Sequence, residues 1–150
     1  MIQKLLLIVV FASTLFSSEL KEGERLKLFV LPDQFEVYHT VDRHVKTIIV
    51  SFEKDTSADI NAYLSSKSPE FLKSKDAVFI ANISKMPAII TKMFAMPKLK
   101  KLKHSILLIN DEADKRFSSK EEKFTIYKLE NSIVKELLYV NSIKELEKAF

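Results

Sequence analysis

Two segments decide the fold, Leu26-Lys-Leu-Phe-Val-Leu-Pro-Asp-Gln-Phe35 and Thr47-Ile-Ile-Val-Ser-Phe52. Side chains alternate between two faces from Leu26 to Leu31, which predicts a strand that Pro32-Asp33 ends. The second segment is apolar on both faces, as central strands covered on both sides are. We therefore predict an open α/β sheet. In such a sheet, the carboxyl end of the strand over 47–52 is the expected place for a ligand or a reactive group.

The composition of the chain excludes several kinds of site. Its 150 residues, 47% hydrophobic and 29% charged, are those of a single ordinary globular domain. The chain has no cysteine, which excludes zinc–thiolate sites, iron–sulfur clusters, disulfides and thiol redox chemistry. Its one glycine excludes the glycine-rich loops that bind phosphates or dinucleotides. The net charge of +4 is mild and no aromatic residues interleave a basic patch, so we expect no nucleic-acid partner.

The N-terminus has the pattern of a targeting segment. Lys4 is followed by an apolar run from Leu5 to Phe16 and by the small residues Ser17-Ser18. The run is shorter than the roughly 18–20 residues that a membrane span needs. We predict a signal peptide over residues 1–18, export to a bacterial periplasm, and no stable membrane span after cleavage. An uncleaved N-terminal anchor is the alternative. After the signal peptide, we predict a loosely structured lead-in segment over residues 19–25 and a single folded domain over residues 26–150.

Farther along the chain, strand and helix patterns alternate. Buried or paired strands are expected over 35–40, 77–83, 105–109, 124–129 and 133–140. One helical segment begins near Ser57 and breaks near 66–68, ahead of Pro69. A longer helix over 84–104 is kinked or ended by Pro97, and a terminal helix is capped by Asn141 or Ser142. Residues 112–123 are charged and predict a loop. The whole is a mixed sheet with helices on both faces.

At this point the chain resembles a known family. Phe29-Val-Leu-Pro-Asp-Gln-Phe35, followed by Thr47–Phe52, is similar to the opening of peroxiredoxin-like and other redoxin-type proteins. The closing hairpin and helix over 124–150 resemble the end of the same thioredoxin fold. Residues Ala81–Pro87, with the chain length and export signal, resemble a group of small, uncharacterised proteobacterial periplasmic proteins. The resemblance implies a thioredoxin-like α/β domain.

The departures from the family concern its chemistry. Thr56-Ser57-Ala58-Asp59 stands roughly where the family carries its reactive cysteines, and neither hydroxyls nor carboxylates can exchange disulfides. The family's proline before the third long strand is expected to be replaced near His104-Ser105. Thr56, Ser57 and Asp59 at a helix N-terminus could bind a small anion, or they could only cap the helix.

Two other groups of residues are candidate sites. His39, Asp42 and His44 could hold a metal ion weakly, or they could be solvated turn residues. The helix over 84–104 carries an apolar stripe beside a lysine cluster, which fits either core packing or a contact surface for a partner or a membrane. The candidate contact residues are Met86, Met93, Met96, Lys98, Lys100 and Lys101. We expect Met96 to face outward and Phe94 to be the core residue.

Two functions remain open from the sequence. The first is a non-catalytic periplasmic binding or adaptor protein with an unidentified periplasmic protein as partner. The alternative is an enzyme or electron-transfer accessory that uses a bound flavin or metal. No motif for a cofactor is present, so no cofactor is predicted.

Overall fold

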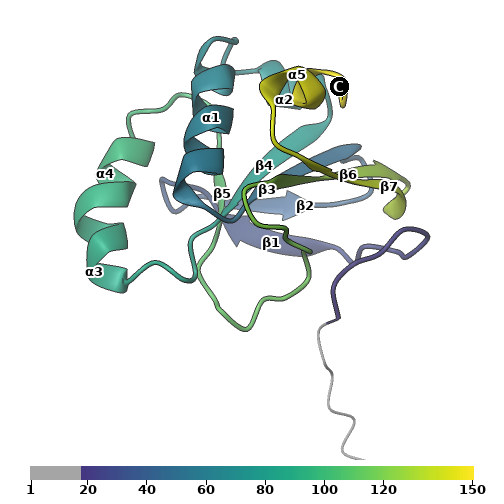
Figure 1. Ribbon diagram of the computed structural model, residues 1–150, viewed down its shortest axis with the longest axis horizontal. Coiled ribbons are helices and arrows are strands. Elements are labelled where there is room, and N and C mark those ends of the chain that lie inside the picture. Colours follow the sequence, from purple (N-terminus) through teal and green to yellow (C-terminus); the bar gives the residue numbers. More distant parts are fainter. Residues whose placement is uncertain (1–17) are drawn as a thin grey trace, which may run out of the picture.

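The computed structural model describes residues 18–150. Its main sheet has five strands in the order β5-β4-β3-β6-β7. The three strands β3, β4 and β5 are parallel, β6 pairs antiparallel with β3, and β7 pairs antiparallel with β6 (Figure 1). The strand bounds are Thr47–Ser51 for β3, Ala77–Asn82 for β4, Leu107–Ile109 for β5, Phe124–Glu130 for β6 and Ile133–Val140 for β7.

The central strand β3 is buried at every position, as its sequence predicts. Alternate side chains enter two separate cores: Ile48 and Val50 contact one cluster, and Ile49 contacts the other. This two-sided burial explains why the large β-branched side chains of the strand are not confined to alternate positions.

One face of the sheet is covered by helices. They are α1 (Lys54–Ser65), α2 (Phe71–Ser74) and α5 (Ile143–Glu147), all above the sheet in Figure 1. The break between α1 and α2 lies where Pro69 predicts it. The hydroxyl of Ser142 accepts a hydrogen bond from the Glu145 N–H at 3.2 Å, so Ser142 is the predicted cap of α5.

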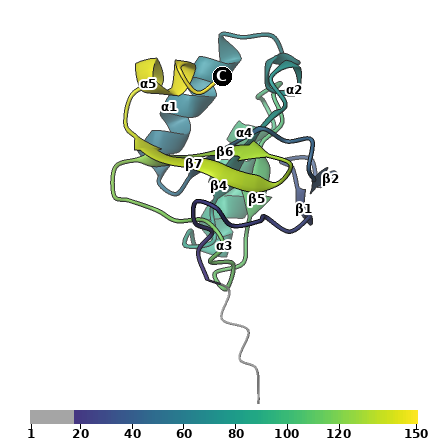
Figure 2. The ribbon, with the colours of Figure 1, turned by 90° about the vertical axis from the view of Figure 1, so that its right-hand side faces the viewer.

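The opposite face is covered by a β-hairpin in place of a helix. Strands β1 (Phe29–Pro32) and β2 (Tyr38–Val41) form a separate antiparallel sheet below the main one (Figures 1 and 2). Phe29 and Leu31 point into the first core, where Phe117 from the long loop also packs. The mixed α/β sheet is thus confirmed, with helices gathered mainly on one side.

Residues 19–25, predicted as a loose lead-in, are part of the domain. The N–H of Gly23 donates to the carbonyl of Val134 at 2.8 Å, and the N–H of Val134 donates to Glu24 at 2.9 Å. Leu20 is buried in the first core at 8% exposure. Charged side chains hide this pairing in the sequence, because the hydrogen bonds to β7 come from the backbone.

The predicted helix over 84–104 is shorter and forms three consecutive pieces. These are α3 (Ala88–Ile90), a π-helical turn η1 (Thr91–Ala95) and α4 (Met96–Leu99). In the π turn, the N–H of Met96 donates to the carbonyl of Thr91, five residues back. The wide turn lies just before Pro97, which has no N–H to donate, and the helix continues past the proline for two residues.

Residues 1–17 carry most of the predicted signal peptide and lie outside the described part, so export stays a prediction. Among residues 18–150, no helix has the length and apolar character needed to cross a bilayer.

Candidate functional site

The predicted reactive position lies in the first turn and a half of α1, directly after β3. The helix begins at Lys54, with Glu53 as its N-cap residue, and not at Thr56 or Ser57 as the sequence suggested. Thr56 is buried, and its hydroxyl donates back to the carbonyl of Glu53 at 3.0 Å. A capping side chain would accept a hydrogen bond from a helix N–H, so Thr56 is a residue of the first turn and not a cap.

The side chain of Glu53 ties the start of α1 to the loop before β6. Its Oε1 atom accepts a hydrogen bond from the N–H of Glu122 at 2.9 Å, and Glu122 has a left-handed φ of 59°. The segment beside the start of α1 is therefore 121–123. His104 and Ser105, near which the family's proline is predicted to be replaced, lead into β5, which is separated from β3 by β4.

The polar side chains at the end of β3 and at positions 56–59 of α1 are hydroxyls and a carboxylate. Ser57 is half-buried, and Ala58 and Asp59 are exposed on α1. The hydroxyl of Ser51, at the end of β3, is buried and has no hydrogen-bond partner. None of these groups can carry a disulfide or a sulfenic acid.

The three candidate metal ligands are not assembled into a site. Nε2 of His39 lies 2.7 Å from Asp33 Oδ2, while Nδ1 of His44 lies 3.2 Å from Asp42 Oδ1. No group of three or more potential metal ligands occurs within residues 18–150. The hypothesis of a metal site is not supported by this geometry, because His39 contacts Asp33 whereas His44 contacts Asp42.

Asp33 is instead a structural residue of the hairpin turn. Its Oδ1 accepts hydrogen bonds from the N–H groups of Phe35 and Val37 at 2.8 and 3.1 Å. Burial acts to raise the pKa of the Asp33 carboxyl, but the hydrogen bonds from His39 and from the two N–H groups outweigh it. The pKa of Asp33 is therefore below its ordinary value.

His104 is a buried polar residue whose role the sequence did not indicate. It is 3% exposed, and its Nε2 lies 2.9 Å from Oδ1 of Asn61 on α1. Burial lowers the pKa of this imidazole, which favours its neutral form. His104 follows Lys100, Lys101 and Lys103 in the sequence, and this lysine-rich context does not indicate that the histidine is buried.

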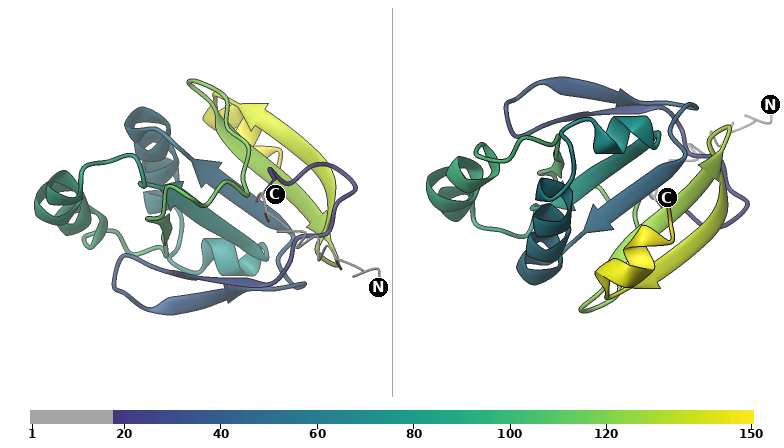
Figure 3. Two further views of the ribbon diagram at one scale, coloured as in Figure 1. Left: turned by 90° about the horizontal axis from the view of Figure 1, so that it is seen from below. Right: turned by 90° about the horizontal axis from the view of Figure 1, so that it is seen from above.

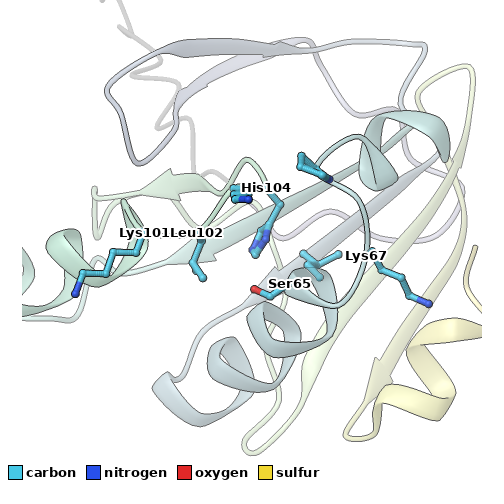
Figure 4. Close-up of a pocket in the computed structure, with 8 residues that line it drawn as sticks. Ser65, Lys67, Lys101, Leu102 and His104 are labelled. Carbon is cyan, nitrogen blue, oxygen red and sulfur yellow. The ribbon is translucent and has the colours of Figure 1, made fainter.

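A pocket of about 330 Å³ lies beside His104, between the end of α1 and the segment after α4. Figure 4 shows Lys67 and Lys101 extending away from His104 on opposite sides. These two lysines therefore do not converge on one point. The lining residues are Leu64, Ser65, Lys67, Pro69, Lys101, Leu102, Lys103 and His104.

The helix formed by α3, η1 and α4, which carries the candidate contact residues, exposes other apolar residues than those expected. Met96 is half-buried and packs against the second core, with Leu99 and Leu102, so the prediction that it faces outward was wrong. Met86 is also half-buried. The exposed residues, here called the outer face, are Ile89, Ile90, Met93 and Phe94, at 65%, 42%, 61% and 58% exposure.

The lysines proposed with this surface are exposed as the sequence suggested. Lys98, Lys100 and Lys101 all lie on or just after α4, and none has an ion-pair partner among the salt bridges of residues 18–150. The helix therefore brings together an exposed apolar face and free cations. Whether a partner uses this surface is taken up below.

Comparisons with known proteins agree on the fold. No protein-family model matches the chain, and no curated protein matches it in sequence. Among solved structures, it is similar to peroxidoxin BcpB from Mycobacterium tuberculosis, at 14% identity and a TM-score of 0.57, covering 87% of this chain and 94% of that one.

Two further structures are similar. A putative thioredoxin from Neisseria meningitidis has 11% identity and a TM-score of 0.56, with 86% of this chain and 91% of that one covered. A putative thiol:disulfide interchange protein DsbE from Chlorobium tepidum has 14% identity and a TM-score of 0.55, with 87% and 96% covered. The chain thus has the predicted thioredoxin-like fold, and it has no cysteine.

Proposed function

We propose that this chain is a non-catalytic binding or adaptor protein of the bacterial periplasm, built on a redoxin fold that has lost its thiol chemistry. The observation that carries the proposal is the first turn of α1. Thr56, Ser57, Ala58 and Asp59 lie in the first turn and a half of this helix, and the resemblance to redoxins implies that this is the position of their reactive cysteines. The Glu53–Glu122 hydrogen bond fastens the adjacent loop.

A binding role is supported by what the fold leaves exposed. The outer face of α3 and η1 is apolar although nothing within residues 18–150 covers it. Monomeric soluble proteins rarely expose contiguous apolar residues without a use for them. The periplasmic location rests on the N-terminal pattern from Lys4 to Ser18.

The test of the lost chemistry is a pair of assays on the purified protein, freed of metal and cofactor. Insulin disulfide reduction and hydroperoxide decomposition should both stay at the buffer blank, because no thiolate is present to attack either substrate. Turnover above the blank in either assay would overturn the proposal.

The proposed location has its own test. After cell fractionation, mass spectrometry of the periplasmic fraction should find a chain that begins near Ser18 or Glu19. Recovery of the chain with intact Met1 in the membrane fraction would instead support the uncleaved anchor.

A further inference from the structure

The helix formed by α3, η1 and α4 is apolar on two opposite sides. Its inner side contributes Met96 and Leu99 to the second core. Its outer face, Ile89, Ile90, Met93 and Phe94, points away from the domain. A surface helix of a monomer is expected to have one apolar stripe and a polar opposite side. A second apolar side on a surface helix is typical of a contact surface.

The charge of the molecule is concentrated around this helix. Residues 77–110 contain no aspartate or glutamate, but they contain six lysines. The whole chain has 24 basic and 20 acidic residues, so the remainder has 24 − 6 = 18 basic residues against 20 acidic ones, a net charge of −2. The positive charge of the protein is thus a local property of this segment, whose lysines are Lys85, Lys92, Lys98, Lys100, Lys101 and Lys103.

The helix also projects from the molecule. In Figures 1 and 3 it lies at one extremity, beyond the edge of the sheet and away from α5 and β7. The outer face is thus carried on a convex element that can approach a flat surface.

We propose that this helix docks the protein on the surface of an anionic phospholipid bilayer. The outer face enters the interfacial region, and the flanking lysines contact the lipid phosphates. Helices that lie in a membrane interface typically combine bulky apolar residues with lysines. Such helices bind anionic lipid both by burying apolar area and by electrostatic attraction. The inference rests on the proposed function and specifies where such an adaptor is held.

Two other occupants fit the surface less well. A second copy of the chain would bring two lysine clusters together, which opposes self-association. A protein partner is less favoured because lysine is depleted in protein–protein interfaces. Both remain outcomes that the experiment can detect.

The first experiment is co-sedimentation with vesicles, using the chain as it is recovered from cells. Vesicles of equal parts phosphatidylglycerol and phosphatidylcholine should retain the protein at low salt, and vesicles of phosphatidylcholine alone should not. The triple variant Lys98→Gln, Lys100→Gln and Lys101→Gln should weaken the partition coefficient roughly tenfold or more. Residues 1–17 are the same in every variant, so any contribution from them cancels.

A matched variant controls for net charge. Lys21→Gln, Lys27→Gln and Lys115→Gln removes three exposed lysines elsewhere, and it should bind nearly as well as the parent. An equal loss in both triple variants would overturn the docking site, because binding would then depend only on total charge.

The second experiment uses fluorescence, since the chain contains no tryptophan. Phe94→Trp places a single reporter on the outer face. Its emission should shift to shorter wavelength on addition of the phosphatidylglycerol vesicles. Tyr38→Trp, on exposed β2, should show no shift.

Three further results would also overturn the inference. They are no retention by anionic vesicles, retention without a shift for Phe94→Trp, and a dimer in solution that Phe94→Ser dissociates. None of these results would bear on the proposed loss of thiol chemistry. Conversely, disulfide or peroxide turnover would overturn the proposed function whatever the vesicles show.

Discussion

The side-chain amide of Gln34 donates a hydrogen bond to the main-chain oxygen of His104 at 2.8 Å, across 70 residues of sequence. Its Oε1 atom accepts from the N–H of Ile106 at 2.9 Å. Gln34 is fully buried. This one side chain therefore attaches the turn of the β1–β2 hairpin to the segment that enters β5, and a backbone bridge between Asp33 and Leu107 continues the contact.

Gln34→Met should destabilise the protein although it preserves most of the side-chain volume. The variant leaves a carbonyl and an N–H without partners in a buried place, and each such group costs about 1–3 kcal/mol. We expect the free energy of unfolding in urea to fall by at least about 2 kcal/mol. Val30→Thr, an isosteric change at an exposed position of β1, is the control and should stay within about 0.5 kcal/mol.

Stability should decrease as the pH falls below the ordinary pKa of histidine, 6.5. The folded pKa of His104 is lowered by burial, so the folded protein binds fewer protons there than the unfolded chain. This contribution is complete above pH 6.5 and is lost as the pH falls through the folded pKa.

The measurement is the midpoint of thermal unfolding across this pH range for the parent and for His104→Gln. The variant removes the titrating imidazole and can keep a donor for Asn61, so its midpoint should depend less on pH. A pH dependence equal to that of the parent would assign the effect to other groups.

Met96→Glu should destabilise the domain, whereas Phe94→Glu should not. Met96 packs against the second core, and a carboxylate there would lose part of its hydration and of the apolar contact that the methionine makes. We expect a loss of about 2 kcal/mol or more for Met96→Glu. Phe94 is mostly exposed, so its loss should be within about 0.5 kcal/mol. Urea unfolding of both variants decides this, and the reverse order would mean that the helix is turned the other way.

Leu20→Ala should lower stability as a core substitution does. Leu20 lies in the first core, and the N–H of Leu20 donates to the carbonyl of Arg116 at 2.8 Å. A loss of about 2 kcal/mol, the low end of the range for buried leucines, is expected. Lys21→Ala, at the exposed neighbouring position, is the control. Equal midpoints for the two variants would show that residues 19–25 are loose after all.

The sequence by itself determined the sheet and the lost chemistry. The run Thr47–Ser51 predicts a strand with both faces covered, because Ile48, Ile49 and Val50 place large β-branched side chains on both of its faces. The hairpin predicted from the strands over 124–129 and 133–140 turns at Asn131 and Ser132, which have left-handed φ values of 48° and 66°. The absence of cysteine is a fact of composition, and no fold can restore a thiolate to α1.

The tertiary structure alone decided the orientation of the helix over 88–99. Its apolar residues surround the axis, and the π turn at Thr91–Ala95 shifts their phase, so periodicity could not tell Met96 from Phe94. The same holds for Gly23 and Glu24, whose attachment to β7 is made by the backbone. His104 lies within a lysine-rich segment, and only the approach of Gln34 and Asn61 from distant parts of the chain gives it buried partners. The local sequence pattern shows which side chains are apolar. Contacts between distant parts of the chain decide which of those side chains are buried.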